Sequence, residues 1–209
     1  MDFYEMVRTN NTCRYYKPDP VPPDVLARVV DAARWAPSGG NRQPLRFIVV
    51  RDRAKKLEMR NLYLPIWDEY IKVRMANAPR SALLEAADHF ARHMEDIPVF
   101  VLALARLADV HPTDTQLGRL SIVGGASVYP AVQNMLLAAR HEGLGTALTT
   151  LHVAEEPKLK EMFDIPEEIS VAAVVMMGWP VKPFPQNLRR APLSGMLFDG
   201  KYGTPFPGA

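Results

Sequence analysis

The stretch from Ala33 to Val50 reads Ala-Arg-Trp-Ala-Pro-Ser-Gly-Gly-Asn-Arg-Gln-Pro-Leu-Arg-Phe-Ile-Val-Val. Upstream of it, apolar residues recur at helical spacing from Val25 to Ala33, which predicts an amphipathic helix. We expect Pro37 to end this helix, because a residue that precedes proline is pushed out of the α region. Phe47 to Val50 form a short apolar run that predicts a buried strand. The stretch therefore joins a helix to a strand through a polar loop.

The loop between this helix and strand is rich in groups that suit a ligand. Gly39 and Gly40 let the backbone approach a ligand closely. Ser38, Asn41 and Gln43 offer donors and acceptors without net charge, which suits a flat heterocycle edged with C=O and N–H groups. The alternative is an ordinary helix-to-strand connection made of turn residues, and composition alone leaves it open.

The loop from Ala36 to Pro44 resembles the signature loop of the nitroreductase-like, FMN-dependent oxidoreductase family. Further stretches resemble that family in the same order along the chain, including a long helix-forming run from Gly124 to Gly143 and a strand with its turn from Ala172 to Pro180. The resemblance implies an α+β fold of three layers, in which helices flank a central mixed sheet, and a homodimer. It also implies one FMN-binding domain over residues 1–209, with an extended tail from about residue 180.

Composition is that of an ordinary globular protein. The net charge of +2 is too small to argue for a nucleic-acid partner. The single cysteine, Cys13, cannot form an internal disulfide, which fits a reducing cytoplasm. The N-terminus lacks the basic start and apolar core of a signal peptide, and no apolar run approaches the ~20 residues of a membrane span. We therefore expect a cytoplasmic protein that contacts neither membranes nor nucleic acid.

The rest of the sequence predicts alternating helices and strands, which favours a layered α/β or α+β domain. Helices are expected over residues 2–9, 53–61, 66–75, 81–94 and 157–163, and from Val128 to a C-cap at Gly143. Strands are expected over 97–105, which reads as central, and 171–177, while 146–151 reads as a short strand or a loop. The tail has no helix or strand period, and either drapes over a partner subunit or is a partly disordered terminus.

Several common chemistries are excluded. Leu148 stands where a dinucleotide fingerprint after Gly143 needs a third glycine, and there is no phosphate-binding Walker loop or nucleophile elbow. His89 and His93 share a helix face, but no cysteine or third histidine lies nearby, so a solvated face is preferred over a metal site. Cys13 has no evident base partner and reads as a small buried residue.

The resemblance implies a set of flavin-binding residues. Thr12 would bond the phosphate or ribityl chain, and Arg14 would lie near the pyrimidine edge or ribityl chain. Asn10 departs from the basic residue that begins this motif, and Arg8 is the candidate to replace it. The other implied residues are Pro37, Ser38, Asn41 and Gln43 around the ring, Leu148, Thr149 and Thr150 facing N5, and Arg189 and Arg190 at the phosphate.

The resemblance implies an enzyme that takes a hydride from NAD(P)H through FMN and passes electrons to a small, aromatic or conjugated acceptor. No acid or base residue is assigned as catalytic, because the flavin carries the hydride. The alternatives are a specialised flavin reaction, such as reductive dehalogenation or flavin fragmentation, and an FMN-binding protein without turnover. Tyr63, Trp67 and Tyr70 form either an aromatic core patch or a cover over the flavin, with Pro65 expected to start their helix.

Overall fold

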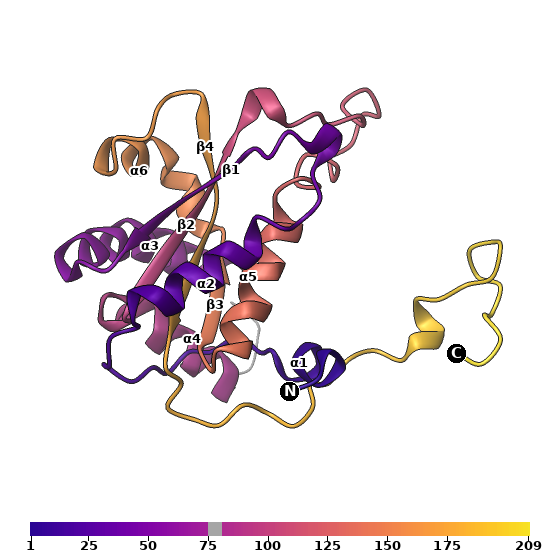
Figure 1. Cartoon of the computed structure of the whole chain (residues 1–209), viewed down its shortest axis with the longest axis horizontal. Helices are drawn as coiled ribbons and strands as arrows, with labels where there is room; N and C mark the ends of the chain where they lie inside the picture. The colour runs from indigo at the N-terminus through magenta and orange to yellow at the C-terminus, as the bar shows by residue number, and fades with distance from the viewer. Residues whose placement is uncertain (75–80) are drawn as a thin grey trace.

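The computed structural model describes residues 1–74 and 81–209. Its helices are α1 (Phe3–Thr9), α2 (Pro23–Ala33), α3 (Arg53–Arg74), α4 (Ala82–Arg92), α5 (Tyr129–His141) and α6 (Glu156–Met162). Its strands are β1 (Leu45–Val50), β2 (Val99–Arg106), β3 (Gly145–Thr149) and β4 (Ile169–Gly178). Figure 1 shows α2 and α5 on one side of the sheet and α3 and α6 on the other. The α+β fold of three layers is confirmed.

The strands lie in the order β1-β2-β4-β3, and each neighbouring pair is antiparallel. Val101 of β2 pairs with Val49 of β1 and with Val175 of β4, so the apolar β2 is central, as predicted. These four strands therefore form an antiparallel sheet, where a mixed sheet was expected; a parallel pairing occurs as an isolated bridge between Thr12 and Thr146 at the β3 edge. The segment before α2 therefore lies beside β3.

The core has two parts, one on each face of the sheet. Alternate residues of β2 point to opposite faces, as the two-residue period of a strand requires. Val99, Val101 and Ala103 pack with α2 and α5, whereas Phe100, Leu102 and Leu104 pack with α3, α4 and α6. Because these β2 residues are all apolar, the strand packs against the helices on both faces of the sheet.

Three details differ from the sequence-based expectations. The α2 helix ends at Ala33, four residues before Pro37, because a turn follows it directly. The β1 strand lies at the sheet edge, and only Val50 of its residues is buried. Arg53–Arg74 is one helix that contains Pro65, where two helices were expected. The end of the second expected helix, at Met75, lies outside the described residues.

The remaining elements agree with the expectations to within a few residues. Residues 146–151 contribute the strand β3 and then a turn of 3-10 helix, Leu151–Glu155. Gly143 follows α5 with a φ of 84°, the left-handed conformation that a glycine C-cap supplies. None of the described helices is long and apolar enough to cross a membrane.

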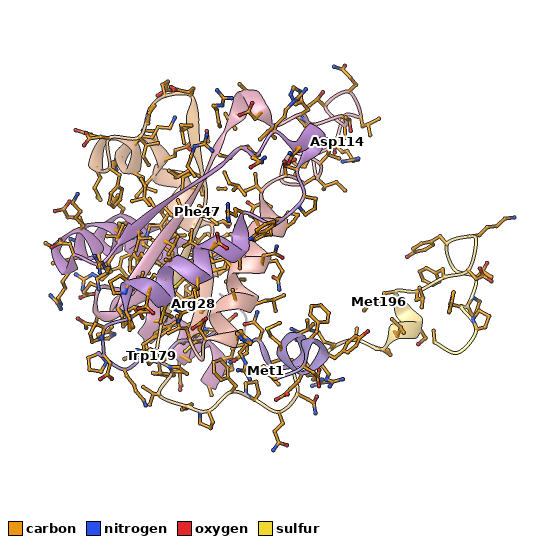
Figure 2. The ribbon with its side chains drawn as sticks, viewed as in Figure 1. Met1, Arg28, Phe47, Asp114, Trp179 and Met196 are labelled. Carbon is orange, nitrogen blue, oxygen red and sulfur yellow. The ribbon has the colours of Figure 1, made fainter. Side chains whose placement is uncertain are left out.

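The C-terminal tail runs away from the layered body (Figure 1). Figure 2 shows Met196 on this tail, far from Phe47 and Arg28 on the body. Residues 180–184 still contact the body, where the Arg140 guanidinium lies 3.7 Å from the centroid of the Phe184 ring. Further along, a bridge joins Phe198 to Pro205, and the rings of Phe198 and Tyr202 are in contact. Its apolar side chains are exposed; they include Leu193, Met196, Tyr202 and Phe206.

Candidate functional site

The site begins where the segment before α2 docks on β3. The Cys13 amide donates to the Thr146 carbonyl at 2.7 Å, and the Tyr16 hydroxyl donates to the Cys13 carbonyl at 2.9 Å. Gly145 permits this approach, because a Cβ there would lie 2.7 Å from the Cys13 side chain. Cys13 is buried, as predicted, and burial raises the pKa of its thiol. The docking fixes Thr12 and Arg14, on either side of Cys13, at the end of the sheet.

A cavity of about 360 Å³ opens at this junction. It is lined by five of the predicted flavin-binding residues: Thr12, Arg14, Leu148, Thr149 and Thr150. The first two precede the other three by more than 130 residues in the sequence. The Arg14 guanidinium forms no ion pair with any of the residues that the structure describes, 1–74 and 81–209. The cavity therefore combines a free guanidinium, hydroxyls and strand-end backbone.

The aromatic side of the cavity comes from α3. Tyr63, Trp67 and Tyr70 all line it, and neighbouring rings stack with centroids 6.2 Å and 5.9 Å apart. Tyr63 and Trp67 are also core residues, 3% and 7% exposed, whereas Tyr70 is 41% exposed. The expectation that Pro65 leaves Tyr63 outside the helix is wrong, because α3 is continuous. The patch thus joins core to cavity along one helix face.

Hydrogen bonds hold this wall in place. The Trp67 indole N–H donates to Asp88 Oδ1 at 3.0 Å, which ties α3 to α4. Burial raises the pKa of Tyr63, and the neighbouring Thr149 side chain and the Arg14 charge oppose the rise. Thr149 Oγ1 accepts from the Leu151 amide at 3.2 Å, which holds the turn after β3.

The sequence did not single out His152, which lies beneath this wall. It is fully buried, and its Nε2 lies 3.2 Å from the Met59 carbonyl. Because a carbonyl only accepts, Nε2 carries the hydrogen, and Nδ1 is left without a partner in the described structure. Burial lowers the pKa of His152 to about 4, so the ring is neutral at pH 7.

The cavity is also lined by apolar residues: Ala87, Phe90, Ala147 and Leu151. Apolar residues of this kind form no motif in the sequence that would identify them as part of a site.

The signature loop, residues 36–44, does not line the β3 cavity. Asn41 and Gln43 have φ values of 53° and 50°, left-handed conformations that are uncommon for residues other than glycine. The Ser38 hydroxyl accepts from the Gln43 amide, and the Ser127 hydroxyl accepts from the Gly39 amide, both at 3.0 Å. Ser38 and Gln43 line a separate cavity, of about 500 Å³, beside α2 and β1. Pinned, strained backbone of this kind is typical of a functional loop.

The remaining predicted residues are not brought to the first cavity. Arg8 is exposed on the last turn of α1, and Pro37 is exposed at the start of the loop. Arg189 and Arg190 are exposed on the tail, where the Arg190 guanidinium donates to the Arg189 carbonyl. The chain therefore presents its predicted flavin-binding residues in four separate places: the β3 cavity, the signature loop, α1 and the tail.

Comparisons with known proteins agree with this fold. The sequence model described as "Nitroreductase family" matches residues 7–179. A relative from Rhodospirillum rubrum, named 5,6-dimethylbenzimidazole synthase, is 31% identical over 179 residues, or 82% of this chain and 79% of the relative. A relative from Methanothermobacter thermautotrophicus, named "Putative NADH dehydrogenase/NAD(P)H nitroreductase", is 25% identical over 184 residues, or 87% of this chain and 79% of the relative.

A solved structure has the same fold. It is oxidized iodotyrosine deiodinase bound to FMN and 3-iodo-L-tyrosine, with a TM-score of 0.69 and 23% identity, covering 90% of this chain and 95% of the other. The family match spans both the β3 cavity and the signature loop. This chain belongs to the nitroreductase family.

Proposed function

We propose that this protein is a homodimeric, FMN-dependent oxidoreductase that uses NAD(P)H to reduce a small aromatic or conjugated acceptor. One observation carries the proposal: Thr12 and Arg14 meet the Leu148–Thr150 segment in a cavity whose remaining wall is aromatic. A relative with the same fold binds FMN, which supports FMN for this cavity. The whole chain, residues 1–209, would act as one flavin-binding unit with its tail.

The donor set fits FMN. Arg14 has no carboxylate partner among residues 1–74 and 81–209, and it would lie against the pyrimidine edge or the ribityl chain. The Thr12 hydroxyl would bond the ribityl chain or phosphate, and backbone groups of Leu148–Thr150 would face N5. A cavity of about 360 Å³ is within the usual size range of sites for small molecules. When bound, FMN supplies the hydride chemistry, which explains why the site needs no catalytic triad.

The protein would contribute binding, orientation and exclusion of water. The His152 ring, which contacts Tyr63 and bonds to the Met59 carbonyl, holds the strand-end segment against α3. Tyr70, the exposed member of the aromatic wall, is placed to stack on a planar acceptor. Apolar Phe90 and Leu151 complete a dry wall. These contacts favour flat, conjugated acceptors over flexible aliphatic ones.

A homodimer accounts for the separation of the predicted residues. The signature loop lines the α2–β1 cavity rather than the β3 cavity of the same chain. A flavin that contacts both sets would then take the β3 cavity from one subunit and the loop from its partner. The exposed apolar tail supports the same assembly, since the side chains of Met196 and Phe206 are 60% and 43% exposed on their own chain.

Purification of the protein with its natural cofactor tests the proposal. We expect a yellow protein that releases FMN on denaturation and oxidises NADPH or NADH when supplied with an acceptor. Nitroaromatics, quinones, enones and halophenols form the acceptor panel, and the relatives' names make a dehalogenation assay part of it. A colourless protein that takes up no FMN would overturn the proposal. A yellow protein that oxidises no nicotinamide would be a flavin-binding protein without turnover.

A further inference from the structure

We propose that a second cavity, beside Tyr15 and α4, binds the phosphorylated adenosine end of the NADPH that reduces the flavin. This inference rests on the proposed function, because it extends the reductant from the β3 cavity. The second cavity has a volume of about 230 Å³. It is lined by Arg14, Tyr15, Tyr16, His89, Phe90, His93, Asp96, Ile97 and Val181.

The wall of this cavity is a column of aromatic rings. Tyr15 stacks on His89 with centroids 5.0 Å apart, and His89 stacks on His93 at 4.5 Å. His93 Nδ1–H donates to the His89 carbonyl at 2.9 Å, which fixes the outer ring and leaves its Nε2 available. The two histidines therefore do more than cover a solvated helix face: they form an ordered heteroaromatic surface that suits a nucleobase and a phosphate.

Backbone hydrogen bonds hold Tyr15, the first ring of this column, in place. The Val181 amide donates to the Tyr15 carbonyl at 3.1 Å, and the Lys17 amide donates to the Trp179 carbonyl at 2.8 Å. This pairing of the two extended segments places Lys182 over the Tyr15 ring, with Nζ 5.2 Å from the centroid. The position of the lysine is thus set by backbone hydrogen bonds that do not depend on the lysine itself.

The charges around the cavity favour an anion. Arg14 and Lys182 form no ion pair with a carboxylate in the part of the chain that the structure describes. The carboxylate that lines the cavity, Asp96, is already held by Arg53, whose Nη2 and Nε lie 2.7 Å and 3.1 Å from Oδ1. Arg14 and two imidazoles therefore line the cavity beside one carboxylate that Arg53 already pairs, and this donor set suits a phosphate.

The location of this cavity next to the β3 cavity indicates which anion it would bind. Arg14 and Phe90 line both this cavity and the β3 cavity, so the two are neighbours that share a wall. A reductant with its nicotinamide in the β3 cavity would extend its adenosine and phosphates across Arg14 into the second. Arg14 and the two imidazoles favour the extra phosphate of NADPH over NADH.

Kinetics with a truncated reductant test the assignment. The variant is His89→Ala/His93→Ala, with His141→Ala, an exposed histidine at the end of α5, as the matched control. The donors are NADPH and 1-benzyl-1,4-dihydronicotinamide, which lacks the adenosine and phosphates. We expect the double variant to raise KM for NADPH by about tenfold. We expect kcat/KM for the truncated donor, FMN content and melting temperature to stay unchanged.

Two outcomes of the kinetic experiment would contradict the proposed NADPH site. An unchanged KM for NADPH, or an equal loss with both donors, would overturn it. Calorimetric titration with adenosine 2′,5′-bisphosphate separates this inference from the proposed function, because binding needs no turnover. Binding to the wild-type protein that weakens in the histidine variant supports the site even if no nicotinamide is oxidised. Absence of binding to the wild-type protein refutes the site even if the enzyme is active.

Discussion

The imidazole of His152 packs against the phenol ring of Tyr63, with ring centroids 4.8 Å apart. His152 follows the Leu148–Thr150 segment by two residues, and Tyr63 and Thr149 line the same cavity. A fully buried ring therefore supports, through Tyr63, the strand end at which the flavin is proposed to bind. Its effect on stability and the role of the wall above it can be measured separately.

His152 should make stability depend on pH. Burial lowers its pKa to about 4 in the folded protein, below the ordinary value of 6.5, so the folded state disfavours the charged ring. Its contribution is therefore fully present above pH 6.5 and is lost as the pH falls from there through 4. We expect the unfolding free energy to decrease by about 3 kcal/mol over this window. Denaturant titrations at several pH values measure it.

The matched variants for this prediction are His152→Gln and His141→Gln. Glutamine at 152 keeps an N–H that reaches the Met59 carbonyl but does not titrate, so the pH dependence should flatten between pH 6.5 and 4. The exposed His141 should leave the dependence as in the wild-type protein. An identical pH slope in His152→Gln and wild type would show that His152 is not its source.

The phosphate clamp predicted from the sequence concerns Arg189 and Arg190. Charge-assisted hydrogen bonds to phosphate contribute roughly 1.5–3 kcal/mol each. Replacing both arginines by alanine should weaken FMN binding by at least about tenfold. Both residues are exposed on the tail, so the fold should not change. Flavin titration measures the affinity, Lys201→Ala is the control from the same tail, and an unchanged affinity in the double variant would remove the tail from the clamp.

Removal of the residues after Leu197 tests the assembly. The lost segment carries Phe198, Tyr202 and Phe206, and Tyr202 is 94% exposed on its own chain. If these side chains cover the partner subunit, the truncated protein should dissociate at higher concentration or lose flavin more readily. Sedimentation velocity over a dilution series and the ratio of flavin to protein measure both effects. A wild-type monomer at micromolar concentration with full flavin occupancy would contradict the homodimer.

Asp114 organises the exposed loop between β2 and α5. Hydrogen bonds from the Ser121 hydroxyl at 2.6 Å, the Ile122 amide at 2.9 Å and Arg119 at 2.8 Å hold the pKa of its carboxyl at about 2. Asp114→Asn would turn an NH₂ group toward these donors. We expect faster amide exchange at Ile122 and faster proteolysis of the loop, with Asp109→Asn as the control from the same loop. Unchanged exchange would show that the loop is held by other contacts.

The sequence predicted the elements whose burial follows a simple period. β2 was recognised as central because every residue from Val99 to Ala105 is apolar, and both of its faces are covered. The β1 run is as apolar, yet it lies at an edge, because strand order depends on contacts that no local pattern encodes. Pro65 was read as a helix start, but Tyr63 and Trp67 on either side of it are buried in one core, and this burial outweighs the lost hydrogen bond.

Prediction of the site was limited in the same way. The motifs identified Thr12, Arg14 and Leu148–Thr150 as separate segments, and only the docking of Cys13 on Gly145 and Thr146 brings them together. The separation of the signature loop from this cavity was not foreseen, because it depends on how the layers stack. His152 was not identified, since one histidine in an apolar segment has no pattern that distinguishes it.

The aromatic wall of α3 gives the last prediction, which divides its members by role. Trp67 is 7% exposed and its indole N–H is held by Asp88, so it belongs mainly to the core between α3 and α4. Trp67→Ala should cost about 3–5 kcal/mol of stability. Tyr70 is 41% exposed on the cavity, so Tyr70→Ala should leave the melting temperature nearly unchanged and raise KM for aromatic acceptors. Thermal unfolding and steady-state kinetics on both variants separate the roles. If Tyr70→Ala retains a normal KM for every aromatic acceptor while Trp67→Ala melts early, the wall is structural and does not cover the flavin.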